Sequence, residues 1–203
     1  MKAWPCIPCL LLIASCGPKP GVRHLADLER ALAQVDSAAA LYEQAPHAEA
    51  APALATVDSA MAVVEARMQG FVVNLEQGKP FSLLDERKRM LKRQPGRHRR
   101  ISQEIDRTRR QIGNLIEAIV DGAQVDALGE PIDTAYFRKA AEDELRICGH
   151  LLEEMDIALD FLERGLRDLD GVVRRADSAS IALTTLPDPP NCCLLYTSPS
   201  PRD

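Results

Sequence analysis

The sequence predicts an all-α protein: elongated antiparallel helical hairpins that form a coiled-coil-like bundle of four main helices. Apolar residues recur at alternating steps of three and four through most of the chain, the spacing of a helix with one packed face. Aromatic residues make up only 4% of the 203 residues, which favours helices packed through aliphatic side chains over a sheet-rich fold. Strand patterns are absent from the sequence.

The first two predicted helices are separated by a short turn that contains Pro46 and Pro52. Residues 25–42 carry one apolar seam, and residues 54–75 carry a second with the same spacing. We expect Gly78 and Pro80 to end the second helix, because glycine and proline are typical of helix ends. The short turn predicts that the two helices form an antiparallel hairpin.

These two helices share a local repeat. Residues 31–40 and 53–62 are identical at eight of ten positions. The repeat indicates either a duplication or two Ala-rich helices that converged on the same heptad pattern. No third copy is present in the sequence, so a solenoid is not predicted.

The third predicted helix begins at a capping box formed by Ser82 and Asp85. The Pro95–Gly96 pair is expected to break or kink it, since proline removes a helical hydrogen bond. The apolar spacing resumes at Ile101 and continues to about Gly122.

The fourth predicted helix is the longest and runs from Thr134 to Thr184, with an apolar seam from Leu145 to Leu183. A helix of that length measures about 75 Å, so we expect an elongated protein. Four glycines inside the predicted helices indicate either close approach of a neighbour or bending, because glycine is otherwise unfavourable there. They are Gly113, Gly149, Gly165 and Gly171.

The N-terminal segment, residues 1–15, combines a basic residue, a short apolar stretch and small residues before Cys16. Ile13-Ala14-Ser15-Cys16 resembles a bacterial lipobox. The resemblance implies cleavage before Cys16 and its acylation, for example with palmitate. Residues 16–21 would then form a lipidated, flexible tether to a membrane. No cofactor is implied.

Residues 22–186 form one predicted helical domain. On Glu104-Ile105-Asp106, Gln111-Ile112-Gly113-Asn114-Leu115, Tyr136 and Glu142, it resembles uncharacterised helical envelope lipoproteins of bacteria. That resemblance implies a bacterial cell-envelope protein held at a membrane, and it implies no known activity. Gly17 and Lys19, in place of an acidic residue after Cys16, favour a periplasm-facing location.

Residues 193–203 read as the translation of a sequencing adapter over all eleven residues, and residues 187–192 form a linker of uncertain origin. If residues 1–15 and 193–203 are set aside, Cys148 is the cysteine that belongs to the helical domain. A disulfide framework is therefore excluded.

Charge is unevenly distributed along the chain. Residues 81–110 contain 11 Lys and Arg against 4 Asp and Glu, whereas residues 111–192 contain 7 against 17. We interpret this first as pairing between the third and fourth helices. Alternatively, the basic tract is a surface for an anionic lipid or envelope polymer. The candidate residues are Arg87, Lys88, Arg89, Lys92, Arg93, Arg97, Arg99 and Arg100.

No constellation in the sequence predicts catalysis. Cys148 and His150 lie about 200° apart around a helix, so they do not form a nucleophile–base pair. His150 shares a helical face with two glutamates, but His24, His47 and His98 are scattered, and we predict no metal site. We therefore expect a non-enzymatic structural or protein-interaction role. The expected partners are envelope proteins or a second copy, with no nucleic acid and no small-molecule substrate.

Overall fold

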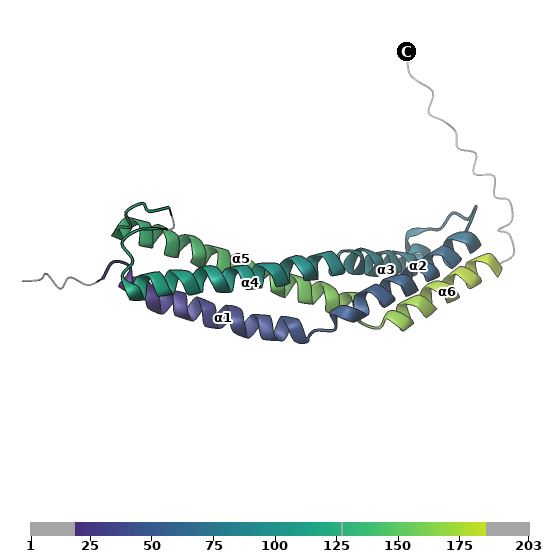
Figure 1. Ribbon diagram of the computed structural model, residues 1–203. Helices are drawn as coiled ribbons and strands as arrows, with labels where there is room; N and C mark the ends of the chain where they lie inside the picture. Colours follow the sequence, from purple (N-terminus) through teal and green to yellow (C-terminus); the bar gives the residue numbers. More distant parts are fainter. Residues whose placement is uncertain (1–18, 127, 186–203) are drawn as a thin grey trace, which may run out of the picture. The chain divides into compact units, whose positions relative to one another are not determined.

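The computed structural model describes residues 19–126 and 128–185, and these residues form an all-α bundle (Figure 1). The expected signal peptide, the lipidation site Cys16, the linker and the adapter-like segment lie outside the described residues. Among the described residues, β-type backbone pairing is limited to one isolated bridge, between Val125 and Pro131. The α-helices are α1 (Leu25–Gln44), α2 (Ala50–Arg67), α3 (Leu75–Lys92), α4 (Gln94–Asp121), α5 (Thr134–Leu166) and α6 (Leu169–Thr185). No helix in the described ranges is both long enough and apolar enough to cross a membrane.

The chain divides into two compact units. Within the described residues, unit 1 comprises 19–37 and 105–151, and unit 2 comprises 38–104 and 152–185. Helices α1, α4 and α5 each contribute residues to both units.

Unit 1 is built around apolar residues that recur at seven-residue steps. Leu28 and Val35 of α1 are completely buried, and Ile105, Ile112 and Ile119 of α4 are at most 1% exposed. A residue seven positions on returns to nearly the same helix face, so each helix buries one continuous stripe. The heptad spacing predicted for these two segments is confirmed.

The first described residues pack onto unit 1. The Lys19 Nζ atom donates a hydrogen bond to the Val120 backbone carbonyl at 2.6 Å. Gly21 has a φ of 85°, and a Cβ atom on it would lie 2.9 Å from Phe137 Cγ and 3.0 Å from Ile119 Cγ1. The last residues of the predicted flexible tether are therefore fixed against α4 and α5, because only glycine fits this backbone conformation and this space.

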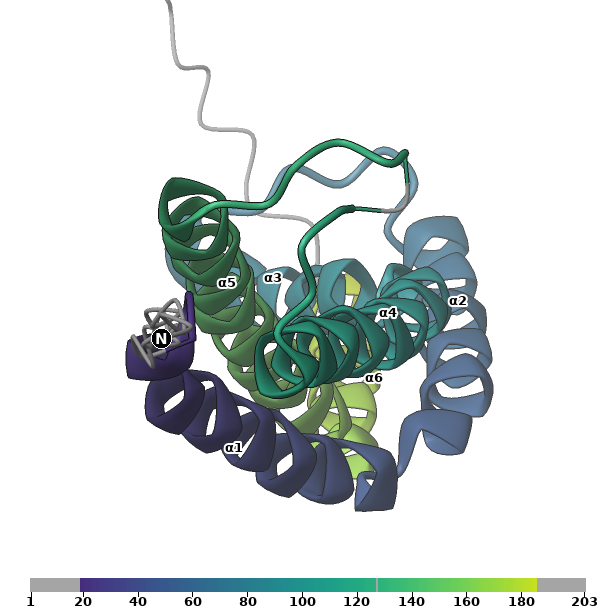
Figure 2. The ribbon, with the colours of Figure 1, turned by 60° about the vertical axis from the view of Figure 1, so that its left-hand side comes forward.

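Unit 2 contains a second core, in which α2, α3 and α6 pack on one another (Figures 1 and 2). The α2 and α3 helices are consecutive and form a helical hairpin. The core residues are Ala50, Ala53, Val57, Val64, Leu84, Leu91, Leu162, Val172 and Ala176. Alanine contributes three of the nine, so these helices approach closely.

The helix boundary after α2 differs from the prediction. Helix α2 ends at Arg67, and α3 begins with a capping box in which Asn74 and Gln77 exchange hydrogen bonds of 3.0 Å. The prediction placed this box at Ser82, but Ser82 lies inside α3. Gly78 and Pro80 also lie inside α3 rather than ending α2. The Asn74 cap satisfies the free N–H groups that start a helix, and it outweighs the local effect of Pro80.

The predicted fourth helix is two helices, because the chain breaks between α5 and α6. Asp168 at the break has a φ of 49°, a left-handed conformation that Asp tolerates better than most residues. On α5, two of the buried positions also differ from the predicted seam by one residue. Leu151 and Ala158 are at most 3% exposed, whereas Leu152 and Leu159 are half-buried.

The break predicted at Pro95–Gly96 is present, with α3 ending at Lys92 and α4 beginning at Gln94. Pro95 occupies the second position of α4, where its missing N–H would be unpaired in any case. Gln94 is 1% exposed, and its Nε2 atom lies 3.4 Å from the Ala158 carbonyl.

Candidate functional site

The basic tract lies across the end of α3 and the start of α4. Some of its residues form ion pairs within the described part of the protein, and others do not. Lys88 pairs with Asp58 of α2 at 2.9 Å, Arg89 with Asp85 at 3.1 Å, and Arg100 with Glu154 of α5 at 3.0 Å. No ion pair to Arg93, Arg97 or Arg99 occurs within residues 19–126 and 128–185.

The predicted pairing of the third helix with the fourth is confirmed only in part. Arg100 and Glu154 pair as expected, but Arg109 pairs with Asp36 of α1 at 2.7 Å. Another link has the opposite polarity, since Arg164 of α5 pairs with Glu86 of α3 at 2.9 Å. Net charge along a segment does not specify which partner each side chain reaches.

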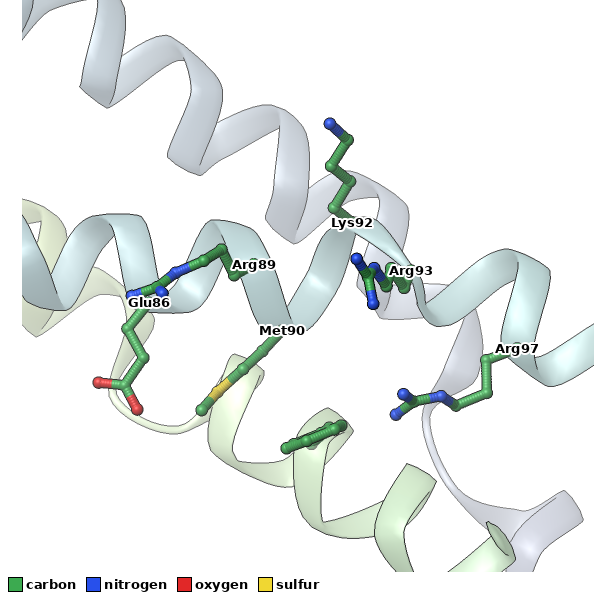
Figure 3. Close-up of a pocket in the computed structure, with 7 residues that line it drawn as sticks. Glu86, Arg89, Met90, Lys92, Arg93 and Arg97 are labelled. Atoms are coloured by element: carbon green, nitrogen blue, oxygen red, sulfur yellow. The ribbon is translucent and has the colours of Figure 1, made fainter.

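An open cleft of about 810 Å³ lies in unit 2 beside the α3–α4 break (Figure 3). Volumes of this order are typical of small-molecule sites. Arg93 and Arg97 extend their guanidinium groups toward the cleft, and Met90 points into it, whereas Lys92 points away. The lining residues are Glu86, Arg89, Met90, Lys92, Arg93, Arg97 and Phe161.

Two of the lining side chains are apolar, Met90 and Phe161, and we refer to them as the floor of the cleft. The guanidinium carbon of Arg97 lies 4.8 Å from the centre of the Phe161 ring, within the range of a cation–π interaction. Phe161 comes from α5, and Met90 comes from α3. The cleft therefore combines two guanidinium groups without ion pairs and two apolar side chains, among the described residues.

Two acidic side chains at or beside the cleft residues are held in ion pairs. Glu86 lines the cleft but binds Arg164, and Asp85 binds the neighbouring Arg89. Positive charge on Arg93 and Arg97 is consequently not neutralised by these carboxylates. An anion entering the cleft would meet planar guanidinium donors, which suit carboxylate and phosphate oxygens.

The structure places the candidate residues differently with respect to the cleft. Arg89, Lys92, Arg93 and Arg97 line it, whereas Arg87, Lys88, Arg99 and Arg100 do not. Phe161 and Met90 were missed by sequence reasoning, because each lies beside a core position, Leu162 and Leu91, and follows no pattern of its own. The nearest sequence signal is the Pro95–Gly96 break, which interrupts helix packing directly beside the tract.

A second cluster joins Tyr42, His47 and His98 in unit 2. The two imidazole rings are stacked with centroids 4.0 Å apart, and the Tyr42 ring lies 4.5 Å from His47. The sequence prediction that these histidines are scattered is therefore wrong for His47 and His98. They are far apart along the chain, and only the fold brings them together.

Several polar atoms in this cluster are buried without hydrogen-bond partners: Tyr42 Oη, His47 Nδ1 and His98 Nδ1. Burial raises the pKa of Tyr42 to about 12, against a smaller opposing effect of Arg97. Burial and the neighbouring His47 lower the pKa of His98, and Glu43 opposes them. These shifts favour the uncharged forms of Tyr42 and His98.

The remaining candidates do not assemble into a site. Cys148 is 2% exposed, as expected for a seam position, and burial followed by Glu144 raises the pKa of its thiol. His150 is exposed on α5. In the part of the chain that the structure describes, no group of three or more His, Cys, Asp or Glu side chains could hold a metal ion.

Comparisons with known proteins identify no relative: no family model, no curated protein and no solved structure matches the chain.

Proposed function

We propose that this protein is a lipid-anchored protein of the bacterial cell envelope with an interaction role and no catalytic activity. Its interaction surface is the cleft beside the α3–α4 break, which binds an anionic ligand. The observation that carries the proposal is the pair Arg93 and Arg97, which both extend toward the cleft and of which neither is held by an ion pair in the described residues.

Two features of the surroundings support binding of an anion here. Glu86, which lines the cleft, and the neighbouring Asp85 are paired with Arg164 and Arg89, and the other polar lining residues are basic. The cleft also shields its ligand on one side with Phe161 and Met90, which strengthens an electrostatic contact by excluding water. A solvated stretch of arginines would offer neither feature.

The proposal is tested by co-sedimentation with vesicles that contain anionic phospholipid, using the full chain with Cys16→Ser so that no acyl anchor is attached. Reversing Arg93 and Arg97 to Glu should reduce binding at least tenfold, since two favourable charges become repulsive. Binding of the parent chain should weaken as salt is raised.

A matched control reverses two other exposed arginines, Arg99 and Arg138, which do not line the cleft. This variant has the same net charge as the Arg93→Glu, Arg97→Glu variant, so a general charge effect would weaken both equally. Equal weakening, or no binding of anionic vesicles by the parent chain, would contradict the proposed site.

The membrane anchor rests on the lipobox resemblance at Cys16 and is tested separately. The full chain made in a bacterial host should incorporate labelled palmitate and fractionate with membranes. The Cys16→Ser chain should do neither. Labelling that persists in the Cys16→Ser chain would contradict acylation at this residue.

Contact with another envelope protein is a second candidate, favoured by an exposed apolar loop between α2 and α3. Val72 is 98% exposed, and Leu75 is 84% exposed. With the neighbouring Phe71, these side chains form an apolar surface of the kind found at protein contacts. Replacing all three with Ser should abolish cross-linking to a partner in cells and leave vesicle binding unchanged.

A further inference from the structure

The side chains that line the cleft indicate the class of its ligand as well as the sign of the ligand's charge. Four lining residues are basic, but the lining also contains a thioether, on Met90, and a phenyl ring, on Phe161, over which Arg97 lies. A purely hydrophilic anion would satisfy the guanidinium groups and leave these apolar side chains against water. A ligand with one anionic head and an alkyl chain would satisfy both parts.

We infer that the cleft binds a single anionic amphiphile, with a phosphate-type head on Arg93 and Arg97 and its alkyl chain on Met90 and Phe161. This inference rests on the proposed function and names the ligand class of the same site. An extended anionic polymer is then not the preferred ligand, because a polymer would contact basic residues along the whole tract.

The division of the basic tract supports a compact ligand. Lys88 and Arg100 lie on either side of the cleft along the chain, and both are held in ion pairs to other helices, with Asp58 and Glu154. A polymer lying along the tract would have to compete with these carboxylates. Among the tract residues that line the cleft, Arg93 and Arg97 extend toward it without an ion pair in the described residues, and they lie four positions apart in sequence.

The Arg97–Phe161 contact indicates where the anionic head of the ligand binds relative to its alkyl chain. The guanidinium carbon of Arg97 lies over the Phe161 ring, 4.8 Å from its centre, and guanidinium N–H groups that do not face the ring can donate to an incoming anion. The head therefore binds at the rim, above the ring. The alkyl chain extends over the part of the floor that Met90 shares, and methionine adapts readily to such chains.

The inference is tested by titration calorimetry of the Cys16→Ser full chain with hexyl, octyl and decyl phosphate, each below its micelle concentration. Affinity should rise roughly two- to fourfold for each added methylene that the cleft covers. Inorganic phosphate, which is the head alone, should bind more weakly than every alkyl phosphate. Decyl maltoside, which has the chain and a neutral head, should not bind measurably.

Variants then separate the two parts of the site. Phe161→Ala should remove most of the dependence on chain length and keep the weak binding of inorganic phosphate, whereas Arg93→Glu with Arg97→Glu should abolish both. Phe71→Ala, an exposed phenylalanine outside the cleft, is the control and should behave like the parent chain. Circular dichroism of each variant checks that the helices are intact.

The outcomes distinguish this inference from the proposed function. If vesicle binding depends on Arg93 and Arg97 but the alkyl phosphates all bind like inorganic phosphate, the amphiphile inference fails and the anion-binding proposal stands. If neither vesicles nor phosphates bind, the proposed function itself fails. A chain-length dependence that Phe161→Ala leaves unchanged would also overturn the inference, since the alkyl chain would then lie elsewhere.

Discussion

The rings of Tyr42, His47 and His98 come from α1, the turn after it and α4. Only the fold brings these three residues into contact. His47 and His98 are separated by 51 positions in sequence, yet their rings stack at 4.0 Å. The charged groups that act on the cluster are Glu43, which favours protonation of His98, and Arg97, which acts on Tyr42. No local pattern in the sequence predicts such a pair.

The stacked histidines predict a dependence of stability on pH. The pKa of His98 in the folded protein lies below its usual value near 6.5, so the unfolded chain binds a proton more readily. Stability should be complete above about pH 6.5 and should fall as the pH drops below it. Thermal unfolding should show a midpoint lower by a few degrees at pH 5 than at pH 7.

The His98→Gln variant provides the control for this prediction, because glutamine cannot take up the proton. Its unfolding midpoint should change less between pH 7 and pH 5 than that of the parent chain. An identical change in both proteins would show that the stacked pair does not cause the effect.

Cys148 was predicted to be a small apolar seam residue, and its burial confirms this. Because the pKa of its thiol is raised, the reactive thiolate is scarce in the folded protein. In a chain whose other cysteines are Ser, a disulfide reagent should modify Cys148 roughly a hundredfold more slowly in buffer than in denaturant. Comparable rates under the two conditions would contradict a closed seam.

At the scale of helices, heptad spacing identified the apolar faces but not the ends. The spacing of Leu162, Leu166, Leu169 and Val173 continues without interruption across the break at Asp168. A break that keeps the same face buried leaves no trace in the periodicity. No proline marks it, and the glycines on either side, Gly165 and Gly171, were predicted to lie inside one continuous helix. The Asn74 cap was missed for a similar reason, since residues on both sides follow the apolar spacing.

Gly165 resolves one alternative that the sequence left open. A Cβ atom on Gly165 would lie 2.8 Å from Leu91 Cδ2, and Leu91 is completely buried, so the glycine permits close approach of α3 and α5. Gly165→Ala should lower the free energy of unfolding by about 1–3 kcal/mol, because overpacking outweighs the better helix propensity of alanine. Chemical denaturation measures this change.

Gly149 in the same helix is the matched control. A Cβ atom on Gly149 would meet no heavy atom within 4 Å. Gly149→Ala should therefore raise the free energy of unfolding by up to about 1 kcal/mol. If both substitutions stabilise the protein, α3 and α5 do not approach as closely as the structure indicates.

For the whole molecule, the sequence predicted the all-α class because composition and spacing both report on packing over many residues. It did not predict two separate units, since the same apolar stripes continue through α4 and α5 from one unit into the other. The cleft was half predicted: its arginines are conspicuous in the sequence, but Phe161 reaches it from a helix more than 60 residues away.

The proposal at the centre of these results is that an anionic amphiphile binds in this cleft, and a fluorescent reporter in its floor tests it most directly. Trp4 is the only tryptophan of the chain, so a Trp4→Phe, Phe161→Trp chain has its single tryptophan in the cleft. Decyl phosphate should shift the emission to shorter wavelength and saturate, and the shift should disappear in the Arg93→Glu, Arg97→Glu background. An emission that stays unchanged while the chain binds anionic vesicles would contradict the proposed site.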